Sequence, residues 1–213
     1  MNPYQETHAT WNKLAEQYEA QFMDMEIYDE SYERFCAAIE KEDASILEVG
    51  CGPGNVTRRL VKAKPEWKIL ATDISPRMLE LAKKANPTIE TVVLDARDLS
   101  DIEGRFDGLV CGFVIPYLSL EDVTTFLKTT AEKLTEGGVL YLSFVPGDPS
   151  KSGFVAGSMG HRSYFYYHGA DDMLDKLKAS GFEVTSSEQV NYTRSNGEVE
   201  EHMVVIASLG SGE

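Results

Sequence analysis

A short apolar segment that runs into closely spaced glycines is the part of this sequence best suited to chemistry. Residues 46–55 read ILEVGCGPGN, in which Gly50, Gly52 and Gly54 follow a run of apolar residues typical of a buried strand. Glycine reaches backbone angles, and allows close ligand approaches, that a Cβ would prevent. A helix that begins after such a turn presents free N–H groups to a carboxylate or phosphate. The segment therefore predicts a binding site for a nucleotide-like cofactor.

The spacing of these glycines bears on the class of cofactor. The dinucleotide fingerprint is Gly-x-Gly-x-x-Gly, whereas this chain has Gly-x-Gly-x-Gly, with Glu48 two residues before the first glycine. Glu48, Gly50, Gly52 and Gly54 match position for position the first motif of the class I S-adenosylmethionine-dependent methyltransferases, which this segment resembles. The motif alone does not separate methyl transfer from hydride transfer. A tight strand-to-helix turn without a ligand is the remaining alternative.

Two further acidic residues follow expected strands. Asp73 ends the strand expected over residues 68–72, where a carboxylate can accept hydrogen bonds from both hydroxyls of a ribose. The resemblance implies this role for Asp73 and implies that Ile74 packs on the adenine. It also implies that the Asp95 side chain meets the adenine amino group, with the backbone N–H of Ala96 on a ring nitrogen. The alternatives are a helix cap for Asp73 and a turn aspartate for Asp95.

The resemblance extends the expected cofactor site to residues that carry no motif of their own. The strand expected over residues 106–113 is similar to the family's fourth strand, whose end faces the transferred methyl group. Tyr18 stands at a place where related small-molecule methyltransferases often contact the cofactor, and aromatic faces suit a cationic sulfonium. The expected cofactor-binding residues are Tyr18, Glu48, Gly50, Cys51, Gly52, Gly54, Asp73, Ile74, Met78, Asp95, Ala96, Gly112 and Phe113.

The residues that follow this fourth strand bear on the methyl acceptor. In amino methyltransferases that act on nucleic acid or glutamine the family pattern here is Asn/Asp-Pro-Pro-Tyr, and a pyrimidine-C5 enzyme has a Pro-Cys nucleophile. Residues 114–117 read VIPY, so both patterns are absent. The sequence thus favours a small-molecule acceptor. It leaves a general base open, with Tyr117, His161 and His168 as weak candidates, and methyl transfer often needs no base.

Helices and strands alternate along the chain, which would bring these residues together. Apolar residues at helical spacing predict two helices before the first strand, over residues 11–22, with Thr10 as cap, and over residues 28–39. Strands that alternate with helices predict a parallel sheet covered on both faces. The other expected helices cover residues 56–62, 75–85, 121–134 and 171–180, and the expected strands cover residues 46–49, 68–72, 91–94, 106–113, 139–144, 182–190 and 201–208.

The end of the chain breaks this alternation. Residues 194–197, between the last two expected strands, contain an Asn-Gly turn that signals an antiparallel hairpin. A doubly wound, mostly parallel seven-stranded sheet that ends in such a hairpin resembles the methyltransferase sheet, whose last strand runs antiparallel to its neighbours. The dinucleotide-binding fold lacks this hairpin. The expected fold is therefore α/β and Rossmann-like, and it favours methyl transfer.

We expect residues 1–213 to form one domain, because this length and a hydrophobic content of 42% suit a single sizeable core. Residues 1–43 are expected to form a helical cover over the site, and residues 44–213 the Rossmann-like core. The cover holds eleven acidic and three basic residues, which would suit a cationic sulfonium and attract a cationic or amine acceptor. A glycine- and serine-rich loop over residues 146–160, followed by aromatic residues over 162–168, predicts either a mobile pocket wall or a plain strand.

Charge and cysteine usage limit the expected partners and location. The formal net charge of −15 would repel a polyanion, so no nucleic acid is expected as a partner. The three cysteines have no C-x-x-C spacing, which argues against a zinc site or a disulfide framework and fits a reducing cytoplasm. The longest uncharged stretch, residues 108–120, is too short for a membrane span, and the polar start of the chain is unlike a signal peptide. The sequence does not indicate an oligomeric state.

Two other functions remain open from the sequence alone. A nicotinamide-dependent oxidoreductase would share the glycine-rich turn, but the chain has neither a second substrate domain nor a Tyr-x-x-x-Lys pair. A module that binds S-adenosylmethionine without catalysis is compatible with the same fold and site, because a cofactor site does not prove turnover. The favoured hypothesis is a methyltransferase that uses S-adenosylmethionine and acts on a small molecule.

Overall fold

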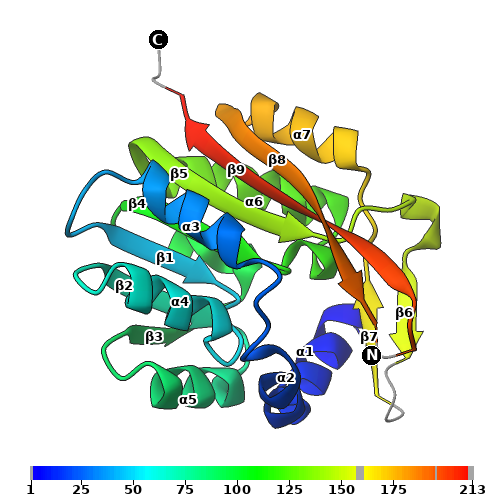
Figure 1. Cartoon of the computed structure of the whole chain (residues 1–213). Helices are drawn as coiled ribbons and strands as arrows, with labels where there is room; N and C mark the ends of the chain where they lie inside the picture. The colour runs from blue at the N-terminus through cyan, green and yellow to red at the C-terminus, as the bar shows by residue number, and fades with distance from the viewer. Residues whose placement is uncertain (1, 157–160, 195, 211–213) are drawn as a thin grey trace.

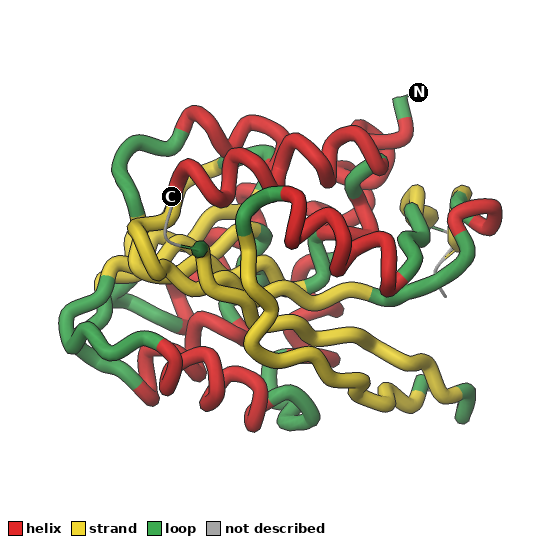
Figure 2. The backbone as a smooth tube through the Cα atoms, turned by 90° about the horizontal axis from the view of Figure 1, so that it is seen from above, coloured by secondary structure: helices red, strands yellow, loops and turns green. Residues whose placement is uncertain are grey.

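A seven-stranded sheet with helices on both faces forms the body of the protein (Figures 1 and 2). The computed structural model describes residues 2–156, 161–194 and 196–210. The strand order is β3-β2-β1-β4-β5-β9-β8, in which the first five strands are parallel and β9 runs antiparallel to both of its neighbours. The predicted fold class, including the terminal hairpin, is confirmed.

The strand bounds agree with the expected ones to within a few residues, apart from the earlier start of β5 and one additional hairpin. Ser195, in the expected turn between the last two strands, lies outside the described residues. The sheet strands are β1 (Ser45–Val49), β2 (Lys68–Asp73), β3 (Glu90–Val93), β4 (Phe106–Gly112), β5 (Leu134–Phe144), β8 (Phe182–Thr193) and β9 (Val199–Leu209). A separate hairpin, β6 (Gly153–Ala156) with β7 (Arg162–Phe165), occupies part of the region expected to be a loop.

The helices follow the predicted alternation. The α-helices are α1 (Pro3–Lys13), α2 (Ala15–Phe22), α3 (Asp29–Ala38), α4 (Asn55–Ala63), α5 (Pro76–Ala85), α6 (Leu120–Lys133) and α7 (Ala170–Ala179). Three short 3-10 helices are η1 (Ala96–Asp101), η2 (Ile115–Tyr117) and η3 (Pro149–Lys151). Within the described ranges, every helix is too short or too polar to serve as a membrane span.

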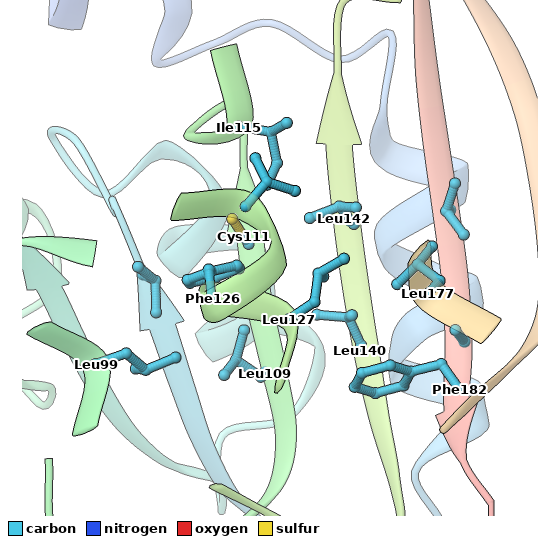
Figure 3. Packing of buried hydrophobic residues seen from close by; sticks show 14 of the residues in the cluster. Leu99, Leu109, Cys111, Ile115, Phe126, Leu127, Leu140, Leu142, Leu177 and Phe182 are labelled. Atoms are coloured by element: carbon cyan, nitrogen blue, oxygen red, sulfur yellow. The ribbon is translucent and has the colours of Figure 1, made fainter. Parts of the chain in front are cut away.

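Two apolar layers cover the two faces of the sheet. On one face, Phe126 and Leu127 of α6 and Leu177 of α7 pack against Leu109 of β4 and Leu140 of β5 (Figure 3). On the other face, side chains of α3, α4 and α5 pack against β1, β2 and β5. Both faces of the central parallel strands β1 and β4 are therefore buried, as a doubly wound sheet requires, whereas the edge strand β3 is mostly exposed.

Helix α3 belongs to the core, which differs from the expectation that all of residues 1–43 form a cover. Phe35 is 0% exposed and packs with Ile46 of β1, Trp67 and Tyr141 of β5. The helical period alone could not distinguish a helix on the sheet from a helix over the site. Only α1 and α2 remain as candidates for the cover.

Helix α1 begins earlier than expected and is fixed to the β6–β7 hairpin. Asn2, instead of Thr10, caps it, and the Thr10 hydroxyl donates to the carbonyl oxygen of Arg162 at 2.8 Å. The Tyr164 N–H donates to the Thr7 hydroxyl at 2.9 Å. These bonds hold α1 against β7 (Figure 1).

Candidate functional site

Two neighbouring cavities lie at the carboxyl ends of the parallel strands, where the strand order reverses between β1 and β4. Cavity A, of about 900 Å³, reaches from the glycine turn after β1 to the ends of β2 and β3. Cavity B, of about 990 Å³, reaches from the same turn toward the β8–β9 hairpin. The residues that line both cavities are Trp11, Tyr18, Gly50, Gly52, Gly112, Phe113 and Tyr117.

The glycine turn between β1 and α4 has the left-handed backbone that favours glycine. The φ angles of Gly50, Gly52 and Gly54 are +69°, +54° and +85°. A Cβ on Gly50 would lie 2.1 Å from Val114 Cγ2, so no side chain fits between the turn and the end of β4. Gly54 lines neither cavity, and a Cβ there would lie 2.5 Å from Asn86 Nδ2. Its missing side chain therefore lets α4 begin close to α5.

Asp73 ends β2 and lines cavity A. Its carboxylate accepts the N–H of Gly52 at 2.9 Å and the N–H of Ser75 at 2.8 Å. Burial raises the pKa of Asp73, and these two donors oppose that rise. Ser75 caps α5 by accepting the Met78 N–H, so Asp73 is not the cap. Its oxygens keep lone pairs that can accept bonds from a ligand.

Asp95 also lines cavity A, but its side chain has a local role as well. It caps η1 by accepting the Arg97 N–H at 3.0 Å and forms an ion pair with the Arg97 guanidinium at 2.5 Å. That guanidinium lies 3.9 Å from the ring centroid of Tyr4 on α1. The turn role that the sequence left open for Asp95 is therefore present, and it fixes the carboxylate at the rim of the cavity.

Glu48 is a buried carboxyl group at the wall of cavity B. It accepts the Thr57 hydroxyl at 2.6 Å, and among the described residues no Lys, Arg or His forms an ion pair with it. Burial raises the pKa of Glu48 to about 8, with the nearby Asp73 contributing, although the Thr57 bond opposes the rise. A cationic ligand group beside it would restore the ionised form.

This pKa predicts that stability depends on pH through Glu48. The folded value of about 8 lies above the ordinary 4.5, so the protonated form is favoured by folding. The contribution is complete below pH 4.5 and is lost as pH rises toward 8. We expect Glu48→Gln, which can still accept from Thr57, to lose less stability than the wild type between about pH 5 and about pH 9. Urea unfolding at both pH values measures this, and equal losses would contradict it.

Phe113, directly after β4, has an unusual backbone at the meeting point of the two cavities. Its φ is +58°, a conformation that non-glycine residues rarely adopt. Its N–H donates to the Ser143 carbonyl at 3.0 Å, which holds the turn against β5. Strained residues of this kind concentrate at functional sites. The turn places the Phe113 ring in the wall that the cavities share.

Residues 46–138 match the family model of a methyltransferase domain. This match spans the glycine turn, Asp73, Asp95 and Phe113, which are the residues that shape cavity A. Residues 46–138 thus belong to this domain family, and the chain is an S-adenosylmethionine-dependent methyltransferase. The match decides for methyl transfer over hydride transfer, which the spacing of the glycines alone did not separate.

Individual relatives differ in what they methylate. The chain is 26% identical over 216 residues to tRNA N(3)-methylcytidine methyltransferase trm141 of Schizosaccharomyces pombe, with 90% of this chain and 86% of that protein covered. It is 33% identical over 97 residues to trans-aconitate 2-methyltransferase of Azoarcus sp., with 46% and 37% covered. The structure of DhpI in complex with SAH matches with a TM-score of 0.76 at 15% identity, covering 98% of both chains.

The methyltransferase gathers most of the expected cofactor residues at the two cavities. The expected residues that line cavity A are Tyr18, Gly50, Gly52, Asp73, Ile74, Met78, Asp95, Ala96, Gly112 and Phe113. Glu48 and Cys51 line cavity B, and Gly54 lines neither. Twelve of the thirteen expected residues therefore lie at one continuous site.

The weak candidates for a general base are not brought together. Tyr117 lines both cavities, and burial raises its pKa. His168 is buried elsewhere in the methyltransferase, with its Nε2 at 3.0 Å from the Leu118 carbonyl oxygen, and burial lowers its pKa. His161 lines neither cavity A nor cavity B. Neither histidine is therefore placed to take a proton at the site.

The sequence analysis missed the polar wall of cavity B. Glu200 and His202 lie on β9 and line this cavity together with Tyr28 and Tyr192. Their spacing of two residues on a strand places both side chains on one face. That spacing was visible in the sequence, but nothing local indicated that this face of the terminal hairpin turns toward the site.

Proposed function

We propose that this methyltransferase transfers a methyl group from S-adenosylmethionine bound in cavity A to a small molecule bound in cavity B. The observation that carries this proposal is that two cavities share one wall, formed by the glycine turn and Phe113. A cofactor and an acceptor on the two sides of this wall would meet at the end of β4. We also propose that residues 1–213 form one domain, with α1 and α2 as its cover.

The residues of cavity A fit the parts of the cofactor. Gly50 and Gly52 provide a turn without side chains for its methionine end, beside the unpaired carboxyl group of Glu48. Asp73 has free lone pairs for the two ribose hydroxyls. Asp95 and the Ala96 N–H would recognise the adenine edge. The packing surfaces for the adenine ring are Ile74, Met78 and Leu94.

The cofactor supplies a methyl group already activated on a sulfonium, so the protein has to align the acceptor and exclude water. Positioning of this kind lowers a barrier by about 7–11 kcal/mol. Trp11 of α1, Tyr18 of α2 and Tyr117 of η2 line both cavities. The cover thus serves to keep water from the reacting atoms.

The walls of cavity B favour a small acceptor over a nucleic acid. Most of its lining is aromatic or apolar, and its described lining residues include no Lys or Arg that could hold phosphates. The net charge of −15 adds repulsion. The tRNA relative trm141 covers most of the chain, so tRNA is the competing acceptor. Incubation of the protein with labelled cofactor and either bulk tRNA or a metabolite extract separates the two, because methylated tRNA would contradict the proposal.

We propose that the acidic residues of the cover do not select a cationic acceptor. Among the described residues, no Asp or Glu of residues 2–43 lines either cavity. Several of these carboxylates form ion pairs on the outside, such as Asp24 with Arg58 and Glu16 with Arg77. The charge expected to attract amines is therefore directed to the surface. The three described cysteines are free thiols, which suits the cytoplasmic location that we propose.

Cofactor binding gives the direct test of this function. We expect S-adenosylmethionine and S-adenosylhomocysteine to raise the melting temperature by several degrees, because a ligand at 100 times its Kd adds about 2.7 kcal/mol. NAD and NADP should not raise it, since the spacing of the glycine turn and the terminal hairpin differ from the dinucleotide-binding fold. Differential scanning fluorimetry measures both effects. Stabilisation by NAD alone would overturn the assignment of cavity A.

A further inference from the structure

Cavity B contains a chain of hydrogen-bonded side chains that cofactor binding does not require. Tyr28 Oη lies 2.5 Å from His202 Nδ1, and His202 Nε2 lies 3.1 Å from Glu200 Oε2. The other Glu200 oxygen accepts from Arg194 Nη2 at 2.6 Å. Tyr28 and His202 are only 7% and 6% exposed, yet both line the cavity. The chain leads from the cavity wall toward the surface.

The partners fix the direction of these bonds. Hydrogen bonds from His202 and Arg194 lower the pKa of Glu200 to about 2, so its carboxylate only accepts. The proton of a neutral His202 is therefore on Nε2, and Nδ1 accepts the hydroxyl hydrogen of Tyr28. Burial raises the pKa of Tyr28, which keeps the hydroxyl protonated. Its oxygen retains lone pairs for a hydrogen bond from a molecule in cavity B.

The end of this chain lies where the two cavities meet. The Phe113 ring centroid is 5.4 Å from that of Tyr28 and 4.9 Å from that of His202. Phe113 belongs to the wall that separates the cavities. The rings of Tyr28 and His202 thus lie beside the wall that separates cavity B from the proposed cofactor site.

On the basis of the proposed function, we propose that Tyr28, hydrogen-bonded in series to His202 and Glu200, takes the proton of a phenolic hydroxyl in cavity B while that hydroxyl is methylated. An oxygen lone pair of the phenol forms the new O–C bond, and the S–C pair returns to sulfur. The phenol proton moves to Tyr28 Oη as the Tyr28 proton moves to His202 Nδ1. One positive charge is thereby transferred from the sulfonium to an imidazolium that the Glu200 carboxylate stabilises.

The proposed acceptor class, a phenol, follows from the ability of these hydrogen-bonded side chains to take up a proton. A carboxylate or a neutral amine needs no base before it attacks, whereas a neutral hydroxyl must lose its proton. Because Tyr28 gives its own proton to His202 as it takes that of the phenol, it stays protonated before and after the step. The aromatic walls of cavity B, with Phe22, Phe165 and Tyr192 among them, suit a flat ring.

The titratable groups that face His202 come from three elements. Tyr28 approaches from the segment before α3, Tyr192 stacks on the imidazole from β8, and Glu200 lies beside it on β9. Arg194 lies beyond Glu200. The experiment therefore changes one residue at a time and leaves the other groups around His202 in place.

The test uses 4-nitrophenol, whose absorbance reports its ionisation, in the complex of the full chain with S-adenosylhomocysteine. We expect the bound probe to ionise at a pH about one unit below that of the free probe, which is tenfold in the ionisation constant. Tyr28→Phe and His202→Gln should abolish this shift while they retain affinity for S-adenosylhomocysteine by calorimetry. His168→Gln, a change at a buried histidine that lines neither cavity A nor cavity B, should leave the shift unchanged.

Methyl transfer from labelled S-adenosylmethionine adds a rate measurement. At pH 8, where 4-methylphenol is neutral, Tyr28→Phe and His202→Gln should methylate it about 10²–10⁴-fold more slowly than the wild type does. This factor is the usual contribution of a general base. With 4-nitrophenol, already ionised at that pH, the loss should be less than tenfold. Binding of S-adenosylhomocysteine without a shift of the probe, or equal rate losses with both phenols, would overturn this inference alone. Failure of the wild type to bind S-adenosylhomocysteine would overturn the proposed function with it.

Discussion

Replacement of Asp73 by alanine should remove most of the cofactor affinity. The carboxylate is proposed to accept both ribose hydroxyls, and each hydrogen bond to a charged group contributes about 1.5–3 kcal/mol. Loss of two such bonds predicts that Kd for S-adenosylhomocysteine rises by a factor of about 10²–10⁴, since each 1.4 kcal/mol is tenfold. Isothermal titration calorimetry measures the change directly.

The same change should also weaken the apo protein, because Asp73 accepts the N–H groups of Gly52 and Ser75. Asp107→Ala is the matched control. Asp107 accepts the Ser45 N–H at 2.8 Å, but it lies at the other end of the sheet, near the start of β4. It should lower stability and leave the Kd unchanged. If the Asp73→Ala protein folds and binds S-adenosylhomocysteine with unaltered affinity, Asp73 is only a turn residue and does not hold the cofactor.

The fold and cavity A were predictable because their signals are local. The glycine turn, Ser75 before Pro76, and the strand before Asp73 each depend on a few consecutive residues whose conformations are limited by sterics and capping. The Asn-Gly pair likewise placed the terminal hairpin. Parallel strands then align their carboxyl ends, so residues that follow different strands meet without any further information.

Cavity B was not predictable because its parts are far apart in the chain. Tyr28 and His202 are separated by 174 positions, and their contact depends on where β9 is inserted between β5 and β8. The core role of α3 was missed for a related reason. A helical period shows which residues share a face, but not whether a sheet or a ligand lies against that face.

Deletion of residues 1–22 should remove the cover of the site and leave the α/β fold intact. Helices α1 and α2 contribute Tyr4, Thr7, His8, Trp11 and Tyr18 to the wall of cavity A. Ala15, Trp11 and Tyr18 pack with Met78 and Leu81 of α5 in a small apolar cluster of their own, apart from the two main cores. The shortened chain should therefore keep its α/β circular dichroism while Kd for S-adenosylhomocysteine rises about a hundredfold or more, which corresponds to about 2.7 kcal/mol.

A second deletion, of residues 1–43, locates the boundary between cover and core. It removes α3 and thus Phe35, which is 0% exposed between the sheet and Trp67. Loss of a buried phenylalanine alone costs about 3–5 kcal/mol, comparable to much of the stability of a domain. We expect this chain to lose its cooperative unfolding transition, unlike the chain that starts at Met23. If the chain without residues 1–22 bound S-adenosylhomocysteine as tightly as the full protein, α1 and α2 would be surface packing and the cofactor would be held by the sheet alone.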